Sequence, residues 1–139
     1  ASRNCRALGC GRIAFLRADF NHPPLRAQSL NLLVGNPPYV STEEYARLPR
    51  EIREYEPKTA LVPVLARGAE ENADGSEAAL NIMHCAETLL KPGGILLLEI
   101  GANHGARLLS ALRAGPWGET RLHADHAGRG RVLAARLCP

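Results

Sequence analysis

Residues 30–39 of the chain read LNLLVGNPPY, an apolar run that ends at two adjacent prolines. A short apolar run of this kind is typical of a strand that is buried on both faces of a parallel sheet. Pro37 and Pro38 lack the N–H group that a sheet ladder needs, so they end the strand, and the proline that follows Asn36 keeps that residue extended. The stretch therefore predicts a stiff loop at the carboxyl end of a central strand, where open α/β sheets bind their ligands.

The loop at residues 36–39, called here the NPPY loop, carries a specific set of polar groups. The side-chain carbonyl of Asn36 can accept a hydrogen bond from an NH2 group, and the backbone carbonyl of Pro37 can accept a second. Tyr39 can lay its ring against a planar group. The loop is therefore predicted to hold a flat amide or amino-heteroaromatic group and to orient its nitrogen for attack on an electrophile. The plainer alternative is a proline-stiffened turn with an asparagine cap.

The motif Asn36-Pro37-Pro38-Tyr39 resembles the N-P-P-Y motif of S-adenosylmethionine-dependent methyltransferases that act on nitrogen. Three further stretches are similar to one such family, HemK/PrmC, the protein-(glutamine-N5) methyltransferases of peptide release factors. The stretches are YEPKTAL at 55–61, EIGANHG at 99–105 and DHAGRGRV at 125–132. They resemble the family's E-P-x-x-A-L segment, its strand-end E-x-G stretch and its closing hairpin. The similarity runs from about residue 1 to the C-terminus and covers only the later part of the family's catalytic domain.

The resemblance implies a fold and an activity. The fold is α/β: the C-terminal part of a Rossmann-like class I methyltransferase, with a mostly parallel sheet and a terminal antiparallel hairpin. The activity is methyl transfer from S-adenosylmethionine to the side-chain amide nitrogen of a glutamine, with a peptide chain release factor as the protein partner. Asn36, Pro37 and Tyr39 are the candidate catalytic residues, and together with Pro38 they are the candidate substrate-binding residues.

A cofactor contact is expected at Asp19 and Phe20, which follow an alternating segment at residues 12–18 that predicts a strand. The resemblance implies that the ring of Phe20 lies against the adenine of S-adenosylmethionine, with Asp19 beside it and Asn36 as a third cofactor-binding residue. Packing of Phe20 in the core is an equal alternative, since that is the usual place of a phenylalanine. We expect the segment 12–18 to be displaced, exposed at an edge or paired non-natively.

Methyltransferases of this class hold the cofactor with a glycine-rich loop after the first strand and an acid after the second. Neither pattern is found, because Gly9-Cys10-Gly11 follows a predicted helix at residues 1–8 and precedes a strand. We interpret residues 1–139 as a partial methyltransferase domain that lacks its first strands and the N-terminal substrate-recognition domain. Two alternatives remain: a non-catalytic remnant that keeps the substrate loop, and an adenine-N6 nucleic-acid methyltransferase.

Composition bounds these alternatives. With 139 residues, of which 45% are hydrophobic and 22% charged, the chain is typical of one globular domain. A net charge of +3 and few aromatic residues do not supply the basic, aromatic-rich face of a nucleic-acid enzyme, so we expect no direct nucleic-acid binding. No apolar run is long enough to span a bilayer. We therefore expect a cytoplasmic protein with no membrane partner.

Metal binding is not expected either. No C-x-x-C pair occurs among the four cysteines, Cys5, Cys10, Cys85 and Cys138, which we interpret as reduced thiols. The spacing of metal ligands is also absent from His84, His104, His123 and His126, for which we expect a place at the surface or in the ordinary core.

The other elements follow from periodicity and from helix and turn signals. The sequence predicts helices at residues 43–48, 77–90 and about 104–114, a strand at 95–100, and a hairpin with strands at 117–124 and 131–137. The strands that end at Val34 and Ile100 are expected to be adjacent, with the hairpin beyond them. Thr42 rather than Ser41 is the predicted cap of the first of these helices, and Ser76 of the second. The turn between the second helix and the strand at 95–100 is predicted at residues 91–94, which read KPGG.

The long connection at residues 49–75 is predicted to form a lip beside the NPPY loop, because long connections in compact domains are usually functional. Within it, Tyr55 and Glu56 are candidates to hold the NPPY loop by hydrogen bonds. The remaining charged residues of this connection are expected to form a solvated face.

Overall fold

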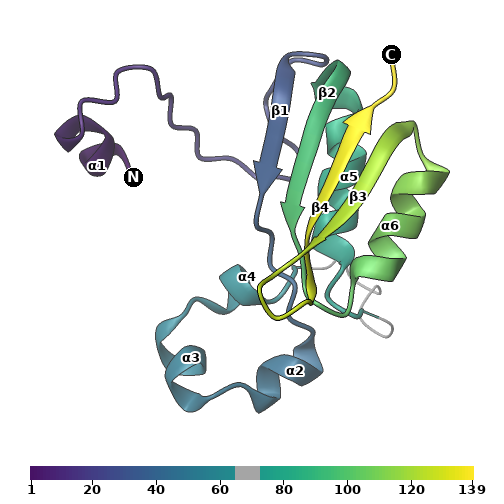
Figure 1. Ribbon diagram of the computed structural model, residues 1–139. Coiled ribbons are helices and arrows are strands. Elements are labelled where there is room, and N and C mark those ends of the chain that lie inside the picture. Colours follow the sequence, from purple (N-terminus) through teal and green to yellow (C-terminus); the bar gives the residue numbers. More distant parts are fainter. Residues whose placement is uncertain (65–72) are drawn as a thin grey trace.

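The computed structural model describes residues 1–64 and 73–139, which form a four-stranded mixed sheet with helices on one face (Figure 1). The elements in chain order are α1 (Ser2–Ala7), β1 (Leu30–Gly35), α2 (Thr42–Arg47), α3 (Arg50–Tyr55), α4 (Lys58–Leu61), α5 (Glu77–Leu89), β2 (Leu90–Glu99), α6 (Gly105–Ala114), β3 (Trp117–Ala124) and β4 (Gly130–Leu137). Figure 1 shows α2, α3 and α4 beyond the carboxyl ends of β1 and β2, below the sheet in this view.

The strands lie in the order β1-β2-β4-β3. β1 pairs in parallel with β2, Val34 opposite Leu97, whereas β4 is antiparallel to both β2 and β3. β1, β2 and β3 therefore run in one direction, but β4 lies between β2 and β3, so only the β1–β2 pair is parallel. The predicted α/β class, the adjacency of the first two strands and the terminal hairpin are confirmed. The mostly parallel sheet is wrong for the described strands, because two of their three pairs are antiparallel.

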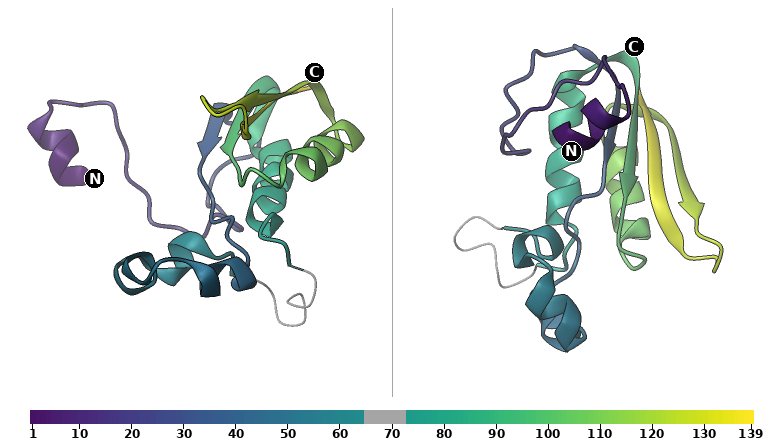
Figure 2. Two further views of the ribbon diagram at one scale, coloured as in Figure 1. Left: turned by 60° about the horizontal axis from the view of Figure 1, so that its bottom comes forward. Right: turned by 90° about the vertical axis from the view of Figure 1, so that its left-hand side faces the viewer.

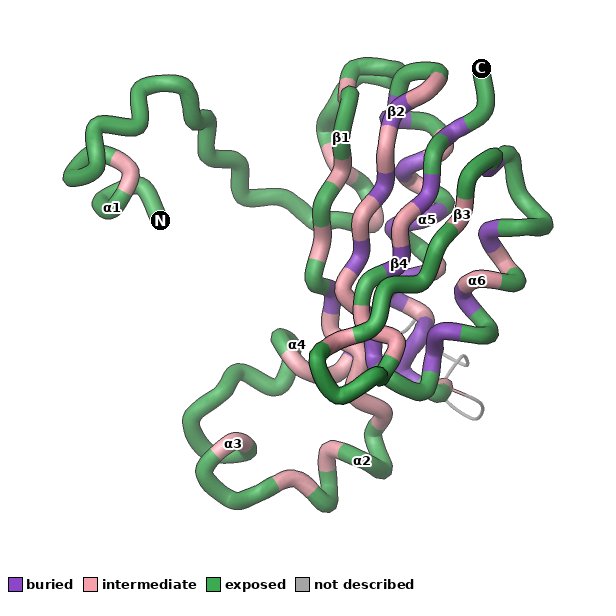
Figure 3. Tube along the Cα trace, in the orientation of Figure 1, coloured by how far each residue is buried: buried purple, intermediate pink, exposed green. Residues whose placement is uncertain are grey.

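One face of the sheet holds the core, which α5 and α6 cover (Figure 3). Side chains alternate along each strand, so every second residue of β2 and β4 points to these helices. The core includes Leu96, Leu98, Leu133, Ala135, Ile82, Ala86, Leu108 and Leu112. Leu30 and Leu33 of β1 pack against this core, and the β1–β2 ladder continues to Gly35, the residue from which the NPPY loop departs.

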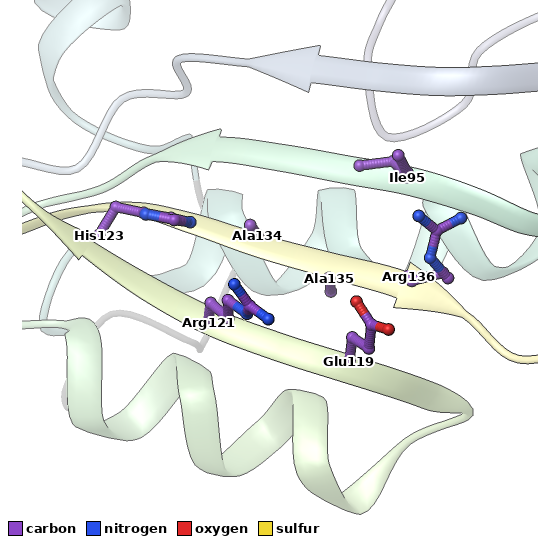
Figure 4. Close-up of a pocket in the computed structure, with 7 residues that line it drawn as sticks. All are labelled: Ile95, Glu119, Arg121, His123, Ala134, Ala135 and Arg136. Carbon is purple, nitrogen blue, oxygen red and sulfur yellow. The ribbon is translucent and has the colours of Figure 1, made fainter.

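The opposite face of the sheet is open within the described part of the chain. Leu32 and Val34 of β1 are exposed on it, 50% and 66% respectively. Over β3 and β4 a shallow groove of about 200 Å³ is lined by residues Ile95, Glu119, Arg121, His123, Ala134, Ala135 and Arg136 (Figure 4). β1 forms one edge of the sheet, so its outer side has no strand partner among the described residues.

The predicted strand at residues 12–18 is wrong. This segment forms no strand and no ladder, and its apolar side chains are exposed, among them Ile13, Phe15 and Leu16. Figure 2 shows α1 and the chain that follows it standing away from the sheet. A strand needs a partner for its backbone groups as well as a suitable pattern, and this segment has none. Its displacement from the sheet was the expected outcome.

The turn predicted at residues 91–94 is wrong: these residues are an irregular part of β2, which runs from Leu90 to Glu99. Leu30 pairs with Leu90 and Leu32 with Ile95, so residues 91–94 loop out of the ladder between them. Gly93 has φ of +77°, a conformation that glycine adopts without strain. The helix ends at Leu89, one residue before the predicted end, and β2 begins at Leu90.

One predicted helix cap is wrong, and the other is confirmed in its position but not in a side-chain hydrogen bond. Ser41, not Thr42, caps α2: its hydroxyl accepts a hydrogen bond from Glu44 N at 3.2 Å, and the Glu44 carboxylate accepts one from Ser41 N at 3.0 Å. This reciprocal pair is a capping box. Ser76 occupies the cap position of α5, but its buried hydroxyl has no hydrogen-bond partner within the described chain. The Glu77 carboxylate instead accepts hydrogen bonds from the backbone of residues 74 and 75.

Candidate functional site

The NPPY loop leaves β1 as an extended, anchored segment. Pro37 is buried and Tyr39 is half-buried, whereas Asn36 is exposed. Beyond the loop, Val40 N donates a hydrogen bond to the Leu61 carbonyl at 2.9 Å, which ties the chain to α4. The loop is therefore held at its second half, while its first residue faces solvent.

The two acceptors predicted from the sequence have no hydrogen-bond partner in the described part of the chain. Neither the side chain of Asn36 nor the carbonyl group of Pro37 makes a hydrogen bond to another described residue. Asn36 is an exposed residue, so its unpaired side-chain carbonyl can accept an incoming N–H group without breaking a protein contact, whereas Pro37 is buried. The start of the NPPY loop thus presents acceptors for a donor such as an amide NH2.

Tyr39 forms part of the wall of a cavity of about 390 Å³, called here the Tyr39 cavity. The cavity lies between α2, the loop that follows β2 and the start of β4. Its wall includes Glu44 and Arg47 from α2, Asn103 and His104 from the loop, and Arg131 from β4. Asn36, Pro37 and Pro38 do not line this cavity, so the structure places Tyr39 alone of the four loop residues in its wall.

Arg131 holds Tyr39 in place. Its Nη2 atom donates a hydrogen bond to Tyr39 Oη at 3.1 Å, and its guanidinium carbon lies 5.3 Å from the centroid of the Tyr39 ring. The same Nη2 atom lies 3.5 Å from Glu99 Oε1. A polar contact and a cation–π contact therefore join the NPPY loop to the ends of β2 and β4.

His104 lies in the cavity wall, with only 6% of its surface exposed. Its Nε2 atom lies 2.9 Å from the Asp74 carbonyl oxygen, and because a carbonyl only accepts, Nε2 carries the proton. Nδ1 is buried and has no partner within residues 1–64 and 73–139. The expectation of an ordinary core position holds for this histidine, and the other three named above, His84, His123 and His126, are exposed.

Asp74 connects α6 to the start of α5. Its carboxylate pairs with Arg107 at 2.6 Å, while its Oδ1 accepts a hydrogen bond from Ser76 N at 3.0 Å. Partial burial opposes ionisation, but the hydrogen bonds from Ser76 and the Arg107 guanidinium outweigh it and lower the pKa of Asp74 to about 2. The carboxylate is therefore charged throughout the neutral pH range.

The predicted role of Tyr55 and Glu56 is wrong. Tyr55 is 82% exposed and Glu56 is exposed as well, and neither side chain hydrogen-bonds to the NPPY loop. Both face solvent because α3 stands clear of the sheet (Figure 1). The predicted lip at residues 49–75 falls partly on residues 65–72, outside the described chain. Residues 49–64 do not line the Tyr39 cavity. The helix that contributes to its wall is α2.

Asp19 and Phe20 lie on a segment that is attached to α5. Asn81 Nδ2 donates a hydrogen bond to Asn21 Oδ1 at 3.1 Å, and Asp19 Oδ1 accepts from Asn21 N at 2.9 Å. The Asn21 backbone lowers the pKa of Asp19 below its usual value. Phe20 is 41% exposed and lies outside the hydrophobic core, so the core-packing alternative is wrong. Neither Asp19 nor Phe20 lines the Tyr39 cavity.

The described residues hold neither a metal centre nor a membrane span. No group of three or more His, Cys, Asp or Glu side chains in this part of the chain is arranged to bind a metal ion. Among the helices of the same residues, none has the length and apolar character to cross a membrane.

The described chain has a mixed α/β architecture, with helices on one face of a four-stranded sheet and the NPPY loop at a strand end. No family model matches the chain. Curated proteins do: the release factor glutamine methyltransferase of Nitratidesulfovibrio vulgaris is 40% identical over 139 residues, which is 98% of this chain and 44% of that protein. Proteins of the same name from Moorella thermoacetica and Enterococcus faecalis are 37% and 35% identical to this chain over 97% of its length. These alignments cover 45% and 46% of the two relatives.

The resemblance to HemK/PrmC is thereby confirmed. Over nearly its whole length the chain is related to the release factor glutamine methyltransferases. It spans less than half of the length of these three relatives.

Arg131, Glu99 and His104 are not among the site residues that the sequence predicts. All three lie in the stretches at 99–105 and 125–132 that resemble the family. The sequence did contain evidence for a site at these residues, because it predicts two neighbouring strands, one ending at the first stretch and the other beginning at the second. Side chains at such neighbouring strand ends lie close together. No feature of the sequence near Tyr39 or Arg131 predicts that these two residues are in contact.

Proposed function

We propose that the chain is the substrate-binding part of a methyltransferase domain that methylates the side-chain amide nitrogen of a glutamine in a peptide chain release factor. The observation that carries the proposal is the NPPY loop, which presents two unpaired acceptors next to a tyrosine fixed at the wall of a cavity. The similarity to release factor glutamine methyltransferases over 98% of the chain gives the substrate class. Peptide chain release factors work in the cytoplasm, so the proposal places the protein there.

The acceptors would act by orientation. The lone pair of an amide nitrogen is delocalised into its carbonyl group, so the nitrogen is a weak nucleophile. Asn36 Oδ1 and the Pro37 carbonyl would each accept one N–H of the amide, and Pro38 would limit their movement. With both N–H groups held, the nitrogen presents its face to the electrophile, and the Tyr39 ring packs on the amide plane. Positioning of this kind accounts for a large part of many enzymatic rate effects.

S-adenosylmethionine would supply a methyl group made electrophilic by the sulfonium to which it is bonded. The cofactor would supply this methyl group to the nitrogen and keep the electron pair of the broken sulfur–carbon bond on its sulfur, and the nitrogen would lose one proton. Phe20 fits a role in holding the cofactor because its ring is exposed and free to stack on a purine. Asn36 and Asp19 are the other proposed cofactor-binding residues.

The domain would be of the Rossmann-like class I type. Two features support this part of the proposal: α5 connects the parallel strands β1 and β2, and the terminal hairpin places antiparallel β4 between β2 and β3. Residues 1–139 would be a partial domain, and the outer edge of β1 would be the position at which its further strands join. The coverage of less than half of each relative cited above agrees with this.

A chimera tests the proposal. This chain would replace the segment that it matches in the Nitratidesulfovibrio vulgaris relative, and the product would be incubated with methyl-labelled S-adenosylmethionine and a release factor. We expect label on a glutamine side chain, located by mass spectrometry. Label on adenine of a DNA duplex in place of glutamine would favour an adenine-N6 enzyme. A folded chimera that labels neither would favour a non-catalytic remnant.

A further inference from the structure

Three side chains from distant parts of the chain meet at the end of the NPPY loop. Tyr39 follows β1, Glu99 ends β2, and Arg131 stands at the start of β4. Arg131 Nη2 donates a hydrogen bond to Tyr39 Oη at 3.1 Å and lies 3.5 Å from Glu99 Oε1, so one nitrogen makes both a hydrogen bond to the tyrosine and an ion pair with the glutamate. The Arg131 side chain is 27% exposed, which is low for an arginine. The guanidinium is thus held, in a half-buried position, against the tyrosine.

The sheet fixes the position of Arg131 independently of the loop. Glu99 is opposite Val132 in the β2–β4 ladder, and Ile100 N donates a hydrogen bond to the Arg131 carbonyl at 2.9 Å. The backbones that carry Glu99 and Arg131 are therefore locked to each other. Tyr39, by contrast, lies in a loop with no ladder of its own. Contacts between a fixed element and a loop set the position of the loop side chain rather than the reverse.

We infer that Arg131 is a positioning residue that sets the plane of the Tyr39 ring against the substrate amide, with Glu99 orienting the guanidinium. This inference rests on the proposed function. Arginine suits the role because its planar guanidinium lies across the ring and at the same time donates hydrogen bonds at fixed angles. Lysine keeps the charge but not the planar group. The loss of Arg131 would leave the Tyr39 ring free to turn into the Tyr39 cavity.

Fluorine NMR of the chain labelled with fluorotyrosine tests the contact, because the sequence holds three tyrosines, Tyr39, Tyr45 and Tyr55. Tyr39→Phe identifies the Tyr39 resonance by removing it. Arg131→Met has a side chain of similar reach with no charge and no N–H group. We expect it to shift the Tyr39 resonance and to leave the other two in place, which also shows that the variant is folded. A Tyr39 resonance that stays in place overturns the inference.

Arg129→Met is the matched control. Arg129 lies in the same hairpin, but its guanidinium pairs with Asp125 at 3.0 Å and not with Tyr39. We expect this variant to leave the Tyr39 resonance unchanged, and Glu99→Gln to give a smaller shift than Arg131→Met. If Arg129→Met moves the resonance as far as Arg131→Met does, the effect belongs to the whole hairpin and the inference fails.

The chimera described above supplies the kinetic readout. We expect Arg131→Met to lower kcat by about 10²-fold, the cost of a small misplacement at a reacting centre, with a smaller change in KM for the release factor. Arg131→Lys should recover part of the loss, because an ammonium still lies over the ring. An Arg131→Met chimera with unchanged kcat overturns the inference. A folded native chimera without activity contradicts the proposed function instead. In that case the NMR experiment alone tests the contact between Arg131 and Tyr39.

Discussion

Gly75 packs against the backbone carbonyl group of Tyr39, so closely that a Cβ atom at position 75 would overlap the carbonyl oxygen. Gly75 also has φ of +96°, a backbone conformation that residues other than glycine rarely adopt. The residue that precedes the cap of α5 therefore buttresses the NPPY loop from behind. Besides the hydrogen bond from Val40 N to the Leu61 carbonyl, Gly75 contacts the backbone of the loop and Arg131 contacts its tyrosine.

Gly75→Ala should consequently disturb the loop more than a positive φ alone would. We expect a loss of about 1 kcal/mol from the backbone conformation and about 1–3 kcal/mol more from the overlap, measured by urea unfolding. Gly93→Ala is the matched control, because Gly93 has φ of +77° but a Cβ atom there would meet no other atom within 4 Å. Equal losses in the two variants would contradict the packing of Gly75 on Tyr39.

Asp74 should make stability depend on pH at the acid end. Its pKa is lowered from 3.8 to about 2 in the folded chain, so the folded state binds this proton less readily than the unfolded state. The stabilisation is complete above pH 3.8 and is lost as the pH falls from there towards about 2. We expect Asp74→Asn to unfold at lower urea concentration at pH 7 and to show a flatter decline in stability across this acid range.

The partner of Asp74 provides the control for that experiment. Arg107→Met removes the ion pair but keeps the hydrogen bond from Ser76 N, so its decline in stability should fall between those of the native chain and Asp74→Asn. Parallel pH profiles for the native chain and Asp74→Asn would show that this carboxylate does not contribute to the acid transition.

The edge of β1 should promote self-association. Leu32 and Val34 are exposed on a strand that ends the sheet order, and such an edge is a template for pairing with another chain. We expect the sedimentation coefficient of the chain to rise with concentration, and Val34→Lys to suppress this rise. Val64→Lys, at a position that is 74% exposed in a loop, should leave it unchanged. Suppression by both variants would point to net charge rather than to the edge.

The elements of the sheet were predictable because their own sequence determines their burial. The apolar runs that became β1 and β2 and the apolar stripe of α5 pack on one another, so pattern and tertiary structure agree. Residues 12–18 have a strand pattern as well, but a pattern does not supply a partner for the backbone. The caps depended on geometry that a sequence does not show, since Ser41 and Thr42 are neighbours with the same hydroxyl group.

The site was predictable where its residues are contiguous and not where they are far apart. Asn36 and Pro37 present acceptors because two prolines follow a strand, which is a local effect. Arg131 is 92 residues from Tyr39, and only the order of strands in the sheet brings them together. The exposure of Tyr55 was also missed, because a resemblance to a motif does not show which way a side chain points.

The hydroxyl and the ring of Tyr39 should contribute separately to turnover. In the chimera with the Nitratidesulfovibrio vulgaris relative, Tyr39→Phe keeps the ring and its contact with the Arg131 guanidinium but loses the hydrogen bond to Nη2. We expect Tyr39→Phe to lower the rate of methylation about 10-fold, the effect of losing one hydrogen bond to a charged group. The rate should fall further in Tyr39→Ala. Equal losses in the two variants would mean that the ring itself does not act on the substrate.

The central claim is that Asn36 orients a glutamine amide for methyl transfer, and turnover of Asn36→Ala in the same chimera tests it most directly. Asn36 is exposed and makes no side-chain hydrogen bond within the described chain, so its removal should leave the melting temperature unchanged. We predict that glutamine methylation of the release factor falls by about 10²–10³-fold, the scale of losing one hydrogen-bonding group that acts on the transition state. Near-native methylation by Asn36→Ala would contradict the account.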